Sequence, residues 1–301
     1  MDNTPIVSIC CLAYNHAPYL RECMDGFMMQ KTDFPFEVII HDDASTDGTT
    51  DIIREYEAKY PDIIKPIYQT ENKYSKGIKI MSEIQFPQAK GKYIAMCEGD
   101  DYWIDPLKLQ KQVDFLEKHP EYSLCFHAVK IKNEDQLDVW ITQSLEEREY
   151  SGPEILKSWT IPTCSAVFRA EMRDKHRSIN RKYNFIFGDI ILWLTCAEIG
   201  KLYCMNQCMG VYRIHKSGMA QTYFDEARRM NNTYFIGKTF RSCRSYTNPI
   251  YARYLARKGF NRITGKHDIM GVTDIIKGVY VHPGMIKNKL LNLLGQVNGK
   301  Q

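Results

Sequence analysis

The sequence lacks several features that would place it outside the ordinary globular proteins. It has no run of about 18 apolar residues, so we predict no membrane-spanning helix. Low-complexity tracts and internal repeats are absent, which excludes fibrous, disordered and repeat architectures. No secretory leader precedes the first apolar segment, and a formal net charge of +4 is too small to argue for nucleic acid. We therefore expect an ordinary folded protein with no nucleic-acid partner.

Cysteine is plentiful, but its pattern lacks the signs of disulfides or zinc. The ten cysteines lie mostly inside apolar runs such as SICCLAY and LWLTCAEIG, where they resemble buried small hydrophobes. Cys204 and Cys208 have no second ligand pair at the spacing of a zinc site, so we predict no structural metal there. Reduced thiols are typical of a cytoplasmic protein, which is the location we expect.

Apolar strands alternate with amphipathic helices over the first two thirds of the chain. Residues 5–13 and 36–43 read as apolar strands, and each precedes a segment with apolar residues at helical spacing. The same signals predict strands at 64–69, 92–98, 122–131, 162–170 and 209–215, and helices within 70–91 and over 105–121 and 189–200. This alternation indicates an α/β fold, with a mostly parallel sheet flanked by helices.

Acidic residues gather where two of these strands end. Asp42 and Asp43 follow the apolar run VII, and Asp47 lies in the loop after them. Ligands of parallel sheets bind at the carboxyl ends of the strands, where a carboxylate can accept hydrogen bonds from a base or a ribose. The alternative is that Ser45, Thr46 or Asp47 caps the following helix.

The strand KYIAMCE ends in the second cluster, which contains Glu98, Asp100 and Asp101. Three carboxylates on one turn repel each other unless a cation offsets their charge. Oxygen ligands at such a place suit Mg²⁺ or Mn²⁺, which also bind the phosphates of a substrate. The alternative is a solvated acidic turn that caps the helix after Pro106.

Together the segments VSICCLAYNH, HDDASTDGT, GKYIAMCEGDDYW, FGDIILW and VYRIH resemble the inverting glycosyltransferases of family two. The resemblance covers about residues 5–217 in the expected order, so it is more specific than any single acidic pair. It implies the GT-A (Rossmann-like) α/β fold, a mostly parallel mixed sheet flanked by helices. It also implies a catalytic domain over 1–217, with a nucleotide-sugar half at about 1–104 and an acceptor half at about 105–217, and a basic helical C-terminal extension over 218–301.

The resemblance assigns a role to each motif. Asp189 stands in the place of the catalytic base, and an inverting transfer needs one carboxylate that takes the proton of the attacking hydroxyl. A position of Asp189 at the start of the following helix is compatible with that role. The residues implied to bind the nucleotide and donor sugar are Ala13, Tyr14, Asn15, Asp42, Asp43, Asp47, Glu98, Gly99 and Asp101.

The implied metal ligands are Asp100 and His215, and the implied acceptor-binding residues are Trp103, Thr163 and Ser165. The metal motif of the family is an Asp-x-Asp, so Glu98 at its first position is a departure. Considered without the resemblance, a lone histidine such as His215 is more often structural than a metal ligand. Tyr14 could equally be a core aromatic residue. Arg213 and Lys216 flank the histidine, where they either meet a diphosphate or are simply solvated.

The resemblance implies an enzyme that transfers a sugar from a nucleotide-diphosphate donor, with UDP expected, to a saccharide or lipid-linked saccharide hydroxyl. Mn²⁺ or Mg²⁺ is the expected cofactor, and cell-surface polysaccharide or lipopolysaccharide synthesis is the expected setting. One alternative is a nucleotidyltransferase, although AYNHAPY after the first strand is not a Gly-rich phosphate loop. Another is a non-catalytic nucleotide-sugar-binding protein, although Asp100 and Asp189 are both present.

The C-terminal part is basic, with nine lysines or arginines against two acids from Arg253 onward. Within residues 282–296, HPGMIKNKLLNLLGQ, the apolar residues can share one face of a helix that carries Lys287 and Lys289. Such a helix either docks on the catalytic domain or on a second subunit of a homo-oligomer, or contacts anionic lipid at the inner membrane face.

Overall fold

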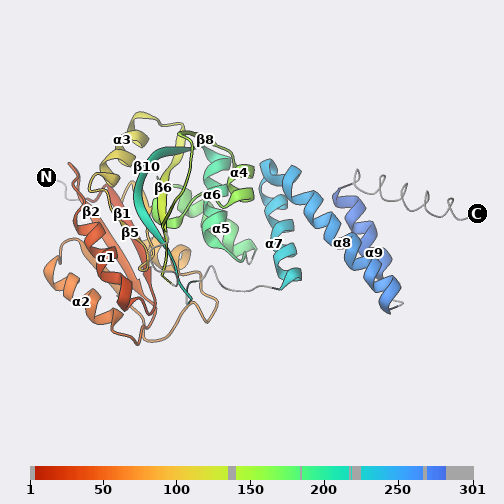
Figure 1. Cartoon of the computed structure of the whole chain (residues 1–301), viewed down its shortest axis with the longest axis horizontal. Coiled ribbons are helices and arrows are strands. Elements are labelled where there is room, and N and C mark those ends of the chain that lie inside the picture. The colour runs from red at the N-terminus through yellow and green to blue at the C-terminus, as the bar shows by residue number, and fades with distance from the viewer. Residues whose placement is uncertain are drawn as a thin grey trace, which may run out of the picture. The chain divides into compact units, whose positions relative to one another are not determined.

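The computed structural model describes residues 4–134, 140–183, 185–216, 218, 225–266 and 270–282. The chain divides into two compact units (Figure 1). The sheet unit contains residues 1–182 and 187–222, and the helical unit contains residues 183–186 and 223–301. None of the helices in these described ranges is long and apolar enough to cross a membrane.

A ten-stranded mixed sheet forms the centre of the sheet unit. The strands are β1 Val7–Ala13, β2 Phe36–Asp42, β3 Ile64–Tyr68, β4 Tyr93–Met96, β5 Tyr102–Trp103, β6 Tyr122–Asn133, β7 Trp140–Thr142, β8 Arg148–Tyr150, β9 Val167–Arg169 and β10 Lys201–Ile214. Their order is β3-β2-β1-β4-β9-β6-β10-β5, with β7 on β6 and β8 on β10. β1 to β4 are parallel, β6 and β10 are parallel, and β9 joins the two groups as an antiparallel strand.

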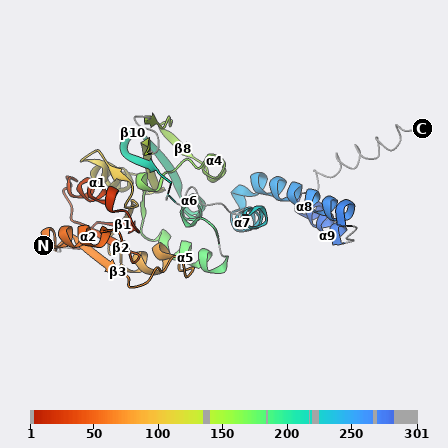
Figure 2. The ribbon, with the colours of Figure 1, turned by 60° about the horizontal axis from the view of Figure 1, so that its bottom comes forward.

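Helices cover both faces of this sheet (Figure 2). They are α1 Ala17–Met28, α2 Thr49–Lys59, α3 Lys108–Lys118, α4 Gly152–Ser158, α5 Met172–Lys182 and α6 Gly188–Ile199. One side of β1, which includes Ile9 and Cys11, joins α1, α2 and α3 in a single apolar cluster. On the other face Phe168 of β9 packs against Phe86 and against Trp193 of α6. With both faces covered, β1 is apolar apart from Ser8, which is the signal seen in the sequence.

The helical unit contains α7 Glu226–Thr239, α8 Arg244–Lys266 and α9 Met270–Val281. The expected helical character of the C-terminal part is therefore confirmed for the described residues. The amphipathic helix expected over residues 282–296 lies outside them, apart from its first residue. The domain boundary expected near residue 217 and the split into donor and acceptor halves stay predictions.

Two segments differ from the expectation. β10 starts at Lys201 instead of residue 209, because its register shifts between Met205 and Cys208 and the two polar residues between them interrupt the apolar pattern. The helix expected within residues 70–91 is reduced to a π turn, Met81–Gln85, and a 3₁₀ turn, Phe86–Gln88. Pro87 stands at the start of the second turn and has no backbone N–H to donate to a longer helix.

All ten cysteines are free thiols, and the expectation that they form no disulfides is met. Nine of them are buried, and Cys208, at the irregular part of β10, is the partly exposed exception. Burial raises the pKa of the Cys97 thiol to about 11 and that of Cys125 to about 12, so these thiols stay neutral.

Gly91, just before β4, is held where a side chain does not fit. A Cβ atom there would lie 2.5 Å from the Ser8 nitrogen and 2.7 Å from the Tyr93 carbonyl oxygen. Both neighbours are backbone atoms of paired strands and cannot move separately. We expect Gly91→Ala to lower the free energy of unfolding by about 3–5 kcal/mol, measured by urea denaturation.

Gly48→Ala is the matched control, because Gly48 has a φ of 99° and almost no neighbour around the position of a Cβ atom. We expect Gly48→Ala to lower the free energy of unfolding by about 1–2 kcal/mol, because an alanine is strained at this positive φ even though it meets no clash. A smaller loss in Gly91→Ala than in Gly48→Ala would show that the close approach at Gly91 is not a constraint.

Candidate active site

The ends of three neighbouring strands bring the predicted residues to one edge of the sheet. β1 lies between β2 and β4 and is parallel to both, so their carboxyl ends coincide. The Asp43 N–H donates to the Ala13 carbonyl at 3.0 Å, and the Gly99 N–H donates to the Leu12 carbonyl at 2.8 Å. The two acidic segments seen in the sequence therefore flank the end of β1 on either side.

Asp42 and Asp43 are both buried and hold the surrounding loops in place. The Asp42 carboxylate accepts a hydrogen bond from the Ser45 N–H at 3.0 Å. The Asp43 carboxylate accepts from the N–H groups of Lys73 and Tyr74, at 2.7 and 3.0 Å. The structure thus connects these acids to backbone, and any contact with a nucleotide would use lone pairs that these bonds leave over.

Asp47 and Asn15 link the loops after β1 and β2. Asp47 accepts from the N–H of Ala17, the first residue of α1, at 3.0 Å and from the Thr49 hydroxyl at 2.6 Å. Burial acts to raise the pKa of Asp47, but these hydrogen bonds outweigh it and the pKa is lowered. Asn15, with a φ of 54°, accepts from the Thr46 N–H at 2.9 Å, and Tyr14 beside it is exposed. Asp47 therefore binds the first N–H of α1. The alternative placed a cap on the following helix, α2, whose N-cap residue is Gly48 and makes no side-chain cap hydrogen bond.

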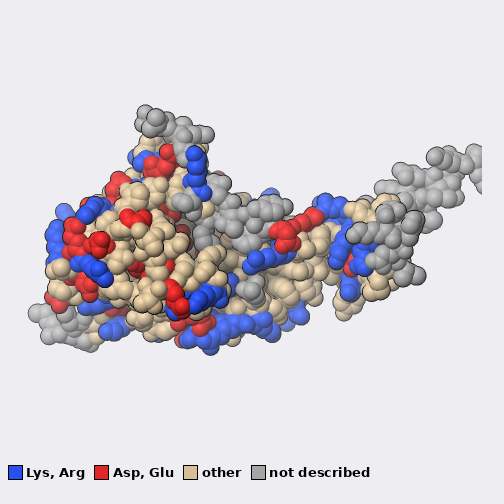
Figure 3. Space-filling view, turned by 90° about the horizontal axis from the view of Figure 1, so that it is seen from below, with Lys and Arg blue, Asp and Glu red and all other residues tan. Residues whose placement is uncertain are grey.

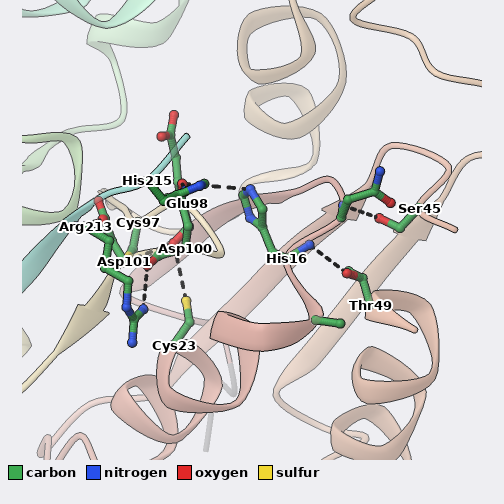
Figure 4. A network of polar contacts seen from close by, with 12 residues as sticks. His16, Cys23, Ser45, Thr49, Cys97, Glu98, Asp100, Asp101, Arg213 and His215 are labelled. Atoms are coloured by element: carbon green, nitrogen blue, oxygen red, sulfur yellow. Dashed lines mark hydrogen bonds and ion pairs between the residues drawn. The ribbon is translucent and has the colours of Figure 1, made fainter. Parts of the chain in front are cut away.

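Asp100 lies between two imidazoles (Figure 4). Its Oδ2 atom is 2.9 Å from His215 Nε2 and 3.8 Å from His16 Nε2. Burial acts to raise the pKa of Asp100, but the two histidines outweigh it and the pKa is lowered, so the carboxylate is ionised. The sequence predicted the meeting of Asp100 and His215. It did not single out His16, whose position one residue after Asn15 at the end of β1 was the available signal.

Arg213 fixes the acidic turn, and its side chain is completely buried. It donates from Nη1 to the Asp100 carbonyl and from Nε to Glu134 at 2.9 Å, and its Nη2 pairs with Glu22 of α1. Its backbone N–H donates to Asp101 Oδ1 at 2.8 Å. The donors of this side chain therefore bind groups of the protein itself, which corrects the two expectations that Arg213 meets a diphosphate or is solvated.

The planar shape of the guanidinium matters at this place. It lies 5.2 Å from the centre of the Tyr19 ring and 4.4 Å from the centre of the Tyr102 ring. An arginine can stack on rings while it donates in several directions in one plane, and a lysine cannot do both. Arg213 therefore joins α1, the acidic turn and the end of β6 in a fixed geometry.

Three other acids, Glu98, Asp101 and Asp189, have raised pKa values, because their surroundings disfavour the ionised form. Burial, followed by the charges of Asp100 and Asp189, raises the pKa of Glu98 to about 8. Burial and the charge of Asp100 also raise the pKa of Asp101 well above its usual range. The pKa of Asp189 is raised by burial as well. The effect of Asp189 on Glu98 shows that the predicted base lies near the acidic turn, although the two are 91 positions apart in the sequence.

Asp189 is held at the start of α6 by a histidine that sequence reasoning missed. His176 of α5 is buried and its Nε2 atom lies 3.0 Å from the carbonyl of Gly188, the residue before Asp189. The Asn180 side-chain amide is 2.8 Å from the same nitrogen. Burial lowers the pKa of His176 to about 4, so the ring is neutral, and its Nε2 atom contacts both the Gly188 carbonyl and the Asn180 amide. No motif marked His176, because α5 meets α6 only in the folded chain.

The three predicted acceptor-binding residues are buried. Trp103 is 1% exposed and donates from Nε1 to the Cys164 carbonyl at 2.8 Å. Ser165 is 0% exposed and donates to the Pro162 carbonyl at 2.7 Å, and Thr163 is also buried. In this structure they support the turn around Asp101 instead of presenting surface to an acceptor, so an acceptor role for them stays a prediction that this geometry does not favour.

No group of three or more His, Cys, Asp or Glu side chains is arranged to hold a metal ion within the described ranges. A cation of the Mg²⁺ or Mn²⁺ type needs fewer side chains, because water and phosphate oxygens complete its shell. Asp100 meets that need, since its Oδ1 atom is buried and has no hydrogen-bond partner among the described residues. The Oδ1 atom of Asp100 is therefore available to such a cation, whereas His215 Nε2 contacts Asp100 Oδ2 in this structure.

The chain is similar to a glycosyltransferase family model and to several known proteins. Residues 8–179 match the family model described as glycosyl transferase family 2. An uncharacterized protein of Mycobacterium tuberculosis strain H37Rv is 39% identical over 228 residues, which cover 75% of this chain and 64% of that protein. This chain therefore spans less than two thirds of that relative's length. The Escherichia coli UDP-Glc:alpha-D-GlcNAc-diphosphoundecaprenol beta-1,3-glucosyltransferase WfaP is 29% identical over 229 residues, which cover 75% of this chain and 84% of that protein.

Solved structures show the same fold. Staphylococcus aureus TarS 1–349 in complex with UDP-GlcNAc has a TM-score of 0.60 at 18% identity, over 91% of this chain and 79% of that one. The mannosyltransferase PcManGT of Pyrobaculum calidifontis, in complex with GDP-Man and Mn²⁺, has a TM-score of 0.54 at 18% identity, over 95% of this chain and 87% of that one. The expected GT-A fold is thereby confirmed.

We expect Arg213→Lys to lower the affinity for Mn²⁺ by about 10–100-fold, because residues that orient a ligand carry that much of a site's affinity. The lysine keeps the positive charge but loses the planar set of donors to Asp100, Glu134 and Glu22. Mn²⁺ affinity is measured by electron paramagnetic resonance, and the free energy of unfolding by urea denaturation.

Arg169→Lys is the matched control. Arg169 is a partly buried arginine that also donates to backbone carbonyls, those of Tyr122 and Leu116. It lies on β9 opposite the start of β4, and among the described residues no hydrogen bond joins it to the acidic turn. We expect a lower free energy of unfolding in both variants, and a lower affinity for Mn²⁺ in Arg213→Lys alone. Equal Mn²⁺ affinity in the two variants would show that Arg213 is merely structural.

His176 makes the fold sensitive to acid. Its pKa is about 4 when folded and about 6.5 when unfolded, so between these values the unfolded chain binds the proton more readily. Stability is therefore full above pH 6.5 and falls as the pH drops toward 4, by about 3 kcal/mol from this residue. We expect His176→Gln to weaken the fall in melting temperature between pH 7 and 4.5. An unchanged slope would mean that the ring is not buried in the neutral form.

Proposed function

Because this chain belongs to glycosyl transferase family 2, we propose that it is an inverting, metal-dependent glycosyltransferase. It transfers a sugar from a nucleotide-diphosphate donor to a saccharide hydroxyl, in the synthesis of a cell-surface polysaccharide. The observation that supports this proposal is the contact of Asp100 with His215 at the carboxyl edge of the sheet, together with the effect of the Asp189 charge on Glu98 of the same turn.

Asp189 acts as the base in this proposal. Inversion requires that the acceptor hydroxyl attacks the anomeric carbon on the side opposite the leaving nucleotide, while a carboxylate removes the hydroxyl proton. Burial raises the pKa of Asp189, which makes its carboxylate a stronger base than an exposed aspartate. The hydrogen bond from His176 to the Gly188 carbonyl fixes the backbone that carries it.

Asp100 and His215 hold the divalent cation in this proposal. When bound, the cation supplies positive charge that stabilises the departing nucleotide diphosphate. The protein prepares this place before any ligand arrives, because Arg213 fixes the Asp100 carbonyl and His215 orients its carboxylate. The loop after β1 and the loop after β2, joined by Asn15 and Ser45, form the wall expected to face the nucleotide.

We propose UDP as the nucleotide and a lipid-linked saccharide as the acceptor. Two comparisons support this choice, since WfaP is named for UDP-Glc and a diphosphoundecaprenol acceptor, and TarS is described with UDP-GlcNAc. The structure of PcManGT contains GDP-Man, so GDP sugars belong in the test. A cytoplasmic location is part of the proposal and is supported by the ten free thiols.

The first experiment is a screen of UDP, GDP and other nucleotide sugars for thermal stabilisation, with and without Mn²⁺. The best donor is then used to measure sugar transfer and donor hydrolysis. We expect Asp189→Asn to reduce the rate by about 10²–10⁴-fold while the donor still binds, because the amide cannot take a proton. Asp100→Ala is expected to lose the additional stabilisation that Mn²⁺ gives in the presence of the donor.

Asp114→Asn is the control, because it makes the same change at an exposed residue of α3 whose side chain, among the described residues, accepts a hydrogen bond from Gln110 and from no other side chain. It should leave both the rate and donor binding unchanged. Equal turnover in the wild type, Asp189→Asn and Asp100→Ala would overturn the mechanism. Donor binding with no turnover in any of them would instead favour a non-catalytic nucleotide-sugar-binding protein.

A further inference from the structure

The outer face of α9 is apolar, although nothing in the described structure covers it. Val272, Ile276 and Tyr280 are spaced four residues apart, so they lie on one side of the helix. Their exposed fractions are 44%, 60% and 89%. Each of them is therefore directed away from α8, the neighbouring helix.

The inner face of α9 carries the residues that a surface helix normally turns to water. Gly271, Asp274 and Gly278 are the buried residues of α9. Asp274 accepts a hydrogen bond from Arg262 of α8 at 3.0 Å, and Lys258 lies 3.8 Å from it. An ion pair thus lies inside the helix pair while an isoleucine and a tyrosine lie outside, which reverses the usual arrangement for a helix in water.

Glycines allow this arrangement. A Cβ atom at Gly259 of α8 would lie 2.3 Å from the Gly271 carbonyl oxygen, so the two helix backbones touch. A Cβ atom at Gly278 would lie 3.1 Å from the Ala252 carbonyl oxygen. Helices that pack through small residues do not need apolar side chains between them, as is common where the surroundings are lipid. The large apolar residues of α9 are therefore available to an outside partner.

The charge of this part of the chain indicates the kind of partner. Residues 225–301 contain 14 lysines and arginines against 4 acids, a net charge of +10, whereas residues 1–224 contain 26 against 32, a net charge of −6. Lys277 is exposed next to Ile276. Figure 3 shows Lys and Arg side chains at several places over the helices of the helical unit. The partner should offer both an apolar layer and negative charge.

We propose that the outer face of α9, formed by Val272, Ile276 and Tyr280, binds the surface of an anionic lipid bilayer. The apolar side chains enter the boundary between head groups and acyl chains, and the surrounding cations meet the lipid phosphates. Phe260 of α8 and Met270, the first residue of α9, are also apolar and exposed, at 54% and 53%.

Other occupants fit less well. A second copy docked through α9 would bring two strongly positive units together, which charge repulsion opposes. A nucleic acid would bind the lysines and arginines through its phosphates. It would leave the apolar outer face of α9 exposed to water. The lipid surface uses both properties, and this proposal does not depend on the proposed transfer reaction.

The test uses the full chain and sedimentation with vesicles, either of phosphatidylcholine alone or with about a third of phosphatidylglycerol. We expect binding to the anionic vesicles, a weaker binding as salt rises, and little binding to the neutral ones. The double variant Ile276→Gln/Tyr280→Gln should bind at least about tenfold more weakly, because it removes the apolar contact and keeps the charge. Both residues are exposed, so the variant should fold normally.

Ile199→Gln is the matched control, because Ile199 is an equally apolar residue of the sheet unit and is 50% exposed. It should bind as the wild type does. All variants keep residues 283–301, so a loss in the double variant alone assigns the contact to α9. The proposal is wrong if the wild type does not bind, if it binds both vesicles equally, or if the double variant binds unchanged. A dimer in light scattering that the double variant dissociates would also overturn it, in favour of self-association.

Discussion

A buried guanidinium surrounded by carboxylates and carbonyls is the interaction on which the site depends. Taking a charge out of water costs several kcal/mol, and Arg213 recovers this only because every part of its side chain has a partner or a ring beside it. Its bonds reach α1, the acidic turn and the end of β6 at once. The turn that carries Asp100 is therefore part of the rigid scaffold, even though it is a short loop with three acids that repel each other.

Most of the fold could be predicted from the sequence, because the sheet is covered on both faces. A parallel strand between two layers of helices is buried on both sides, and β1 and β2 show this as runs in which most residues are apolar, such as ICCLA and VII. The prediction failed where the backbone departs from a regular ladder. The irregular register of β10 after Met205 and the π turn before Pro87 follow from tertiary contacts, such as the two hydrogen bonds from Gln85 to the Cys11 and Ile39 carbonyls.

The candidate site likewise has features that the sequence predicts and features that only the folded chain shows. Carboxylates at strand ends can be read from the sequence, and the structure brings Asp100 to His215 as expected. The contacts that support them could not be found in this way. His16 and Arg213 stand in segments whose neighbours are set only by the order of strands, and His176 acts on a carbonyl, which no residue pattern records. The burial of Trp103 and Ser165 likewise depends on how β5 pairs with β10, a contact of only two residues.

The distribution of the thiols has a practical consequence. Cys208 is partly exposed on a strand of the central sheet, while the other nine thiols are shielded in the interior and have no ready access to reagents. A maleimide-linked fluorophore or spin label would therefore attach to one defined place in the unmodified chain. Since β10 contains Cys208 and Arg213 and ends at Ile214, one residue before His215, such a label would sit on the strand that leads to the imidazole of the site, and would give an optical or magnetic signal of events there.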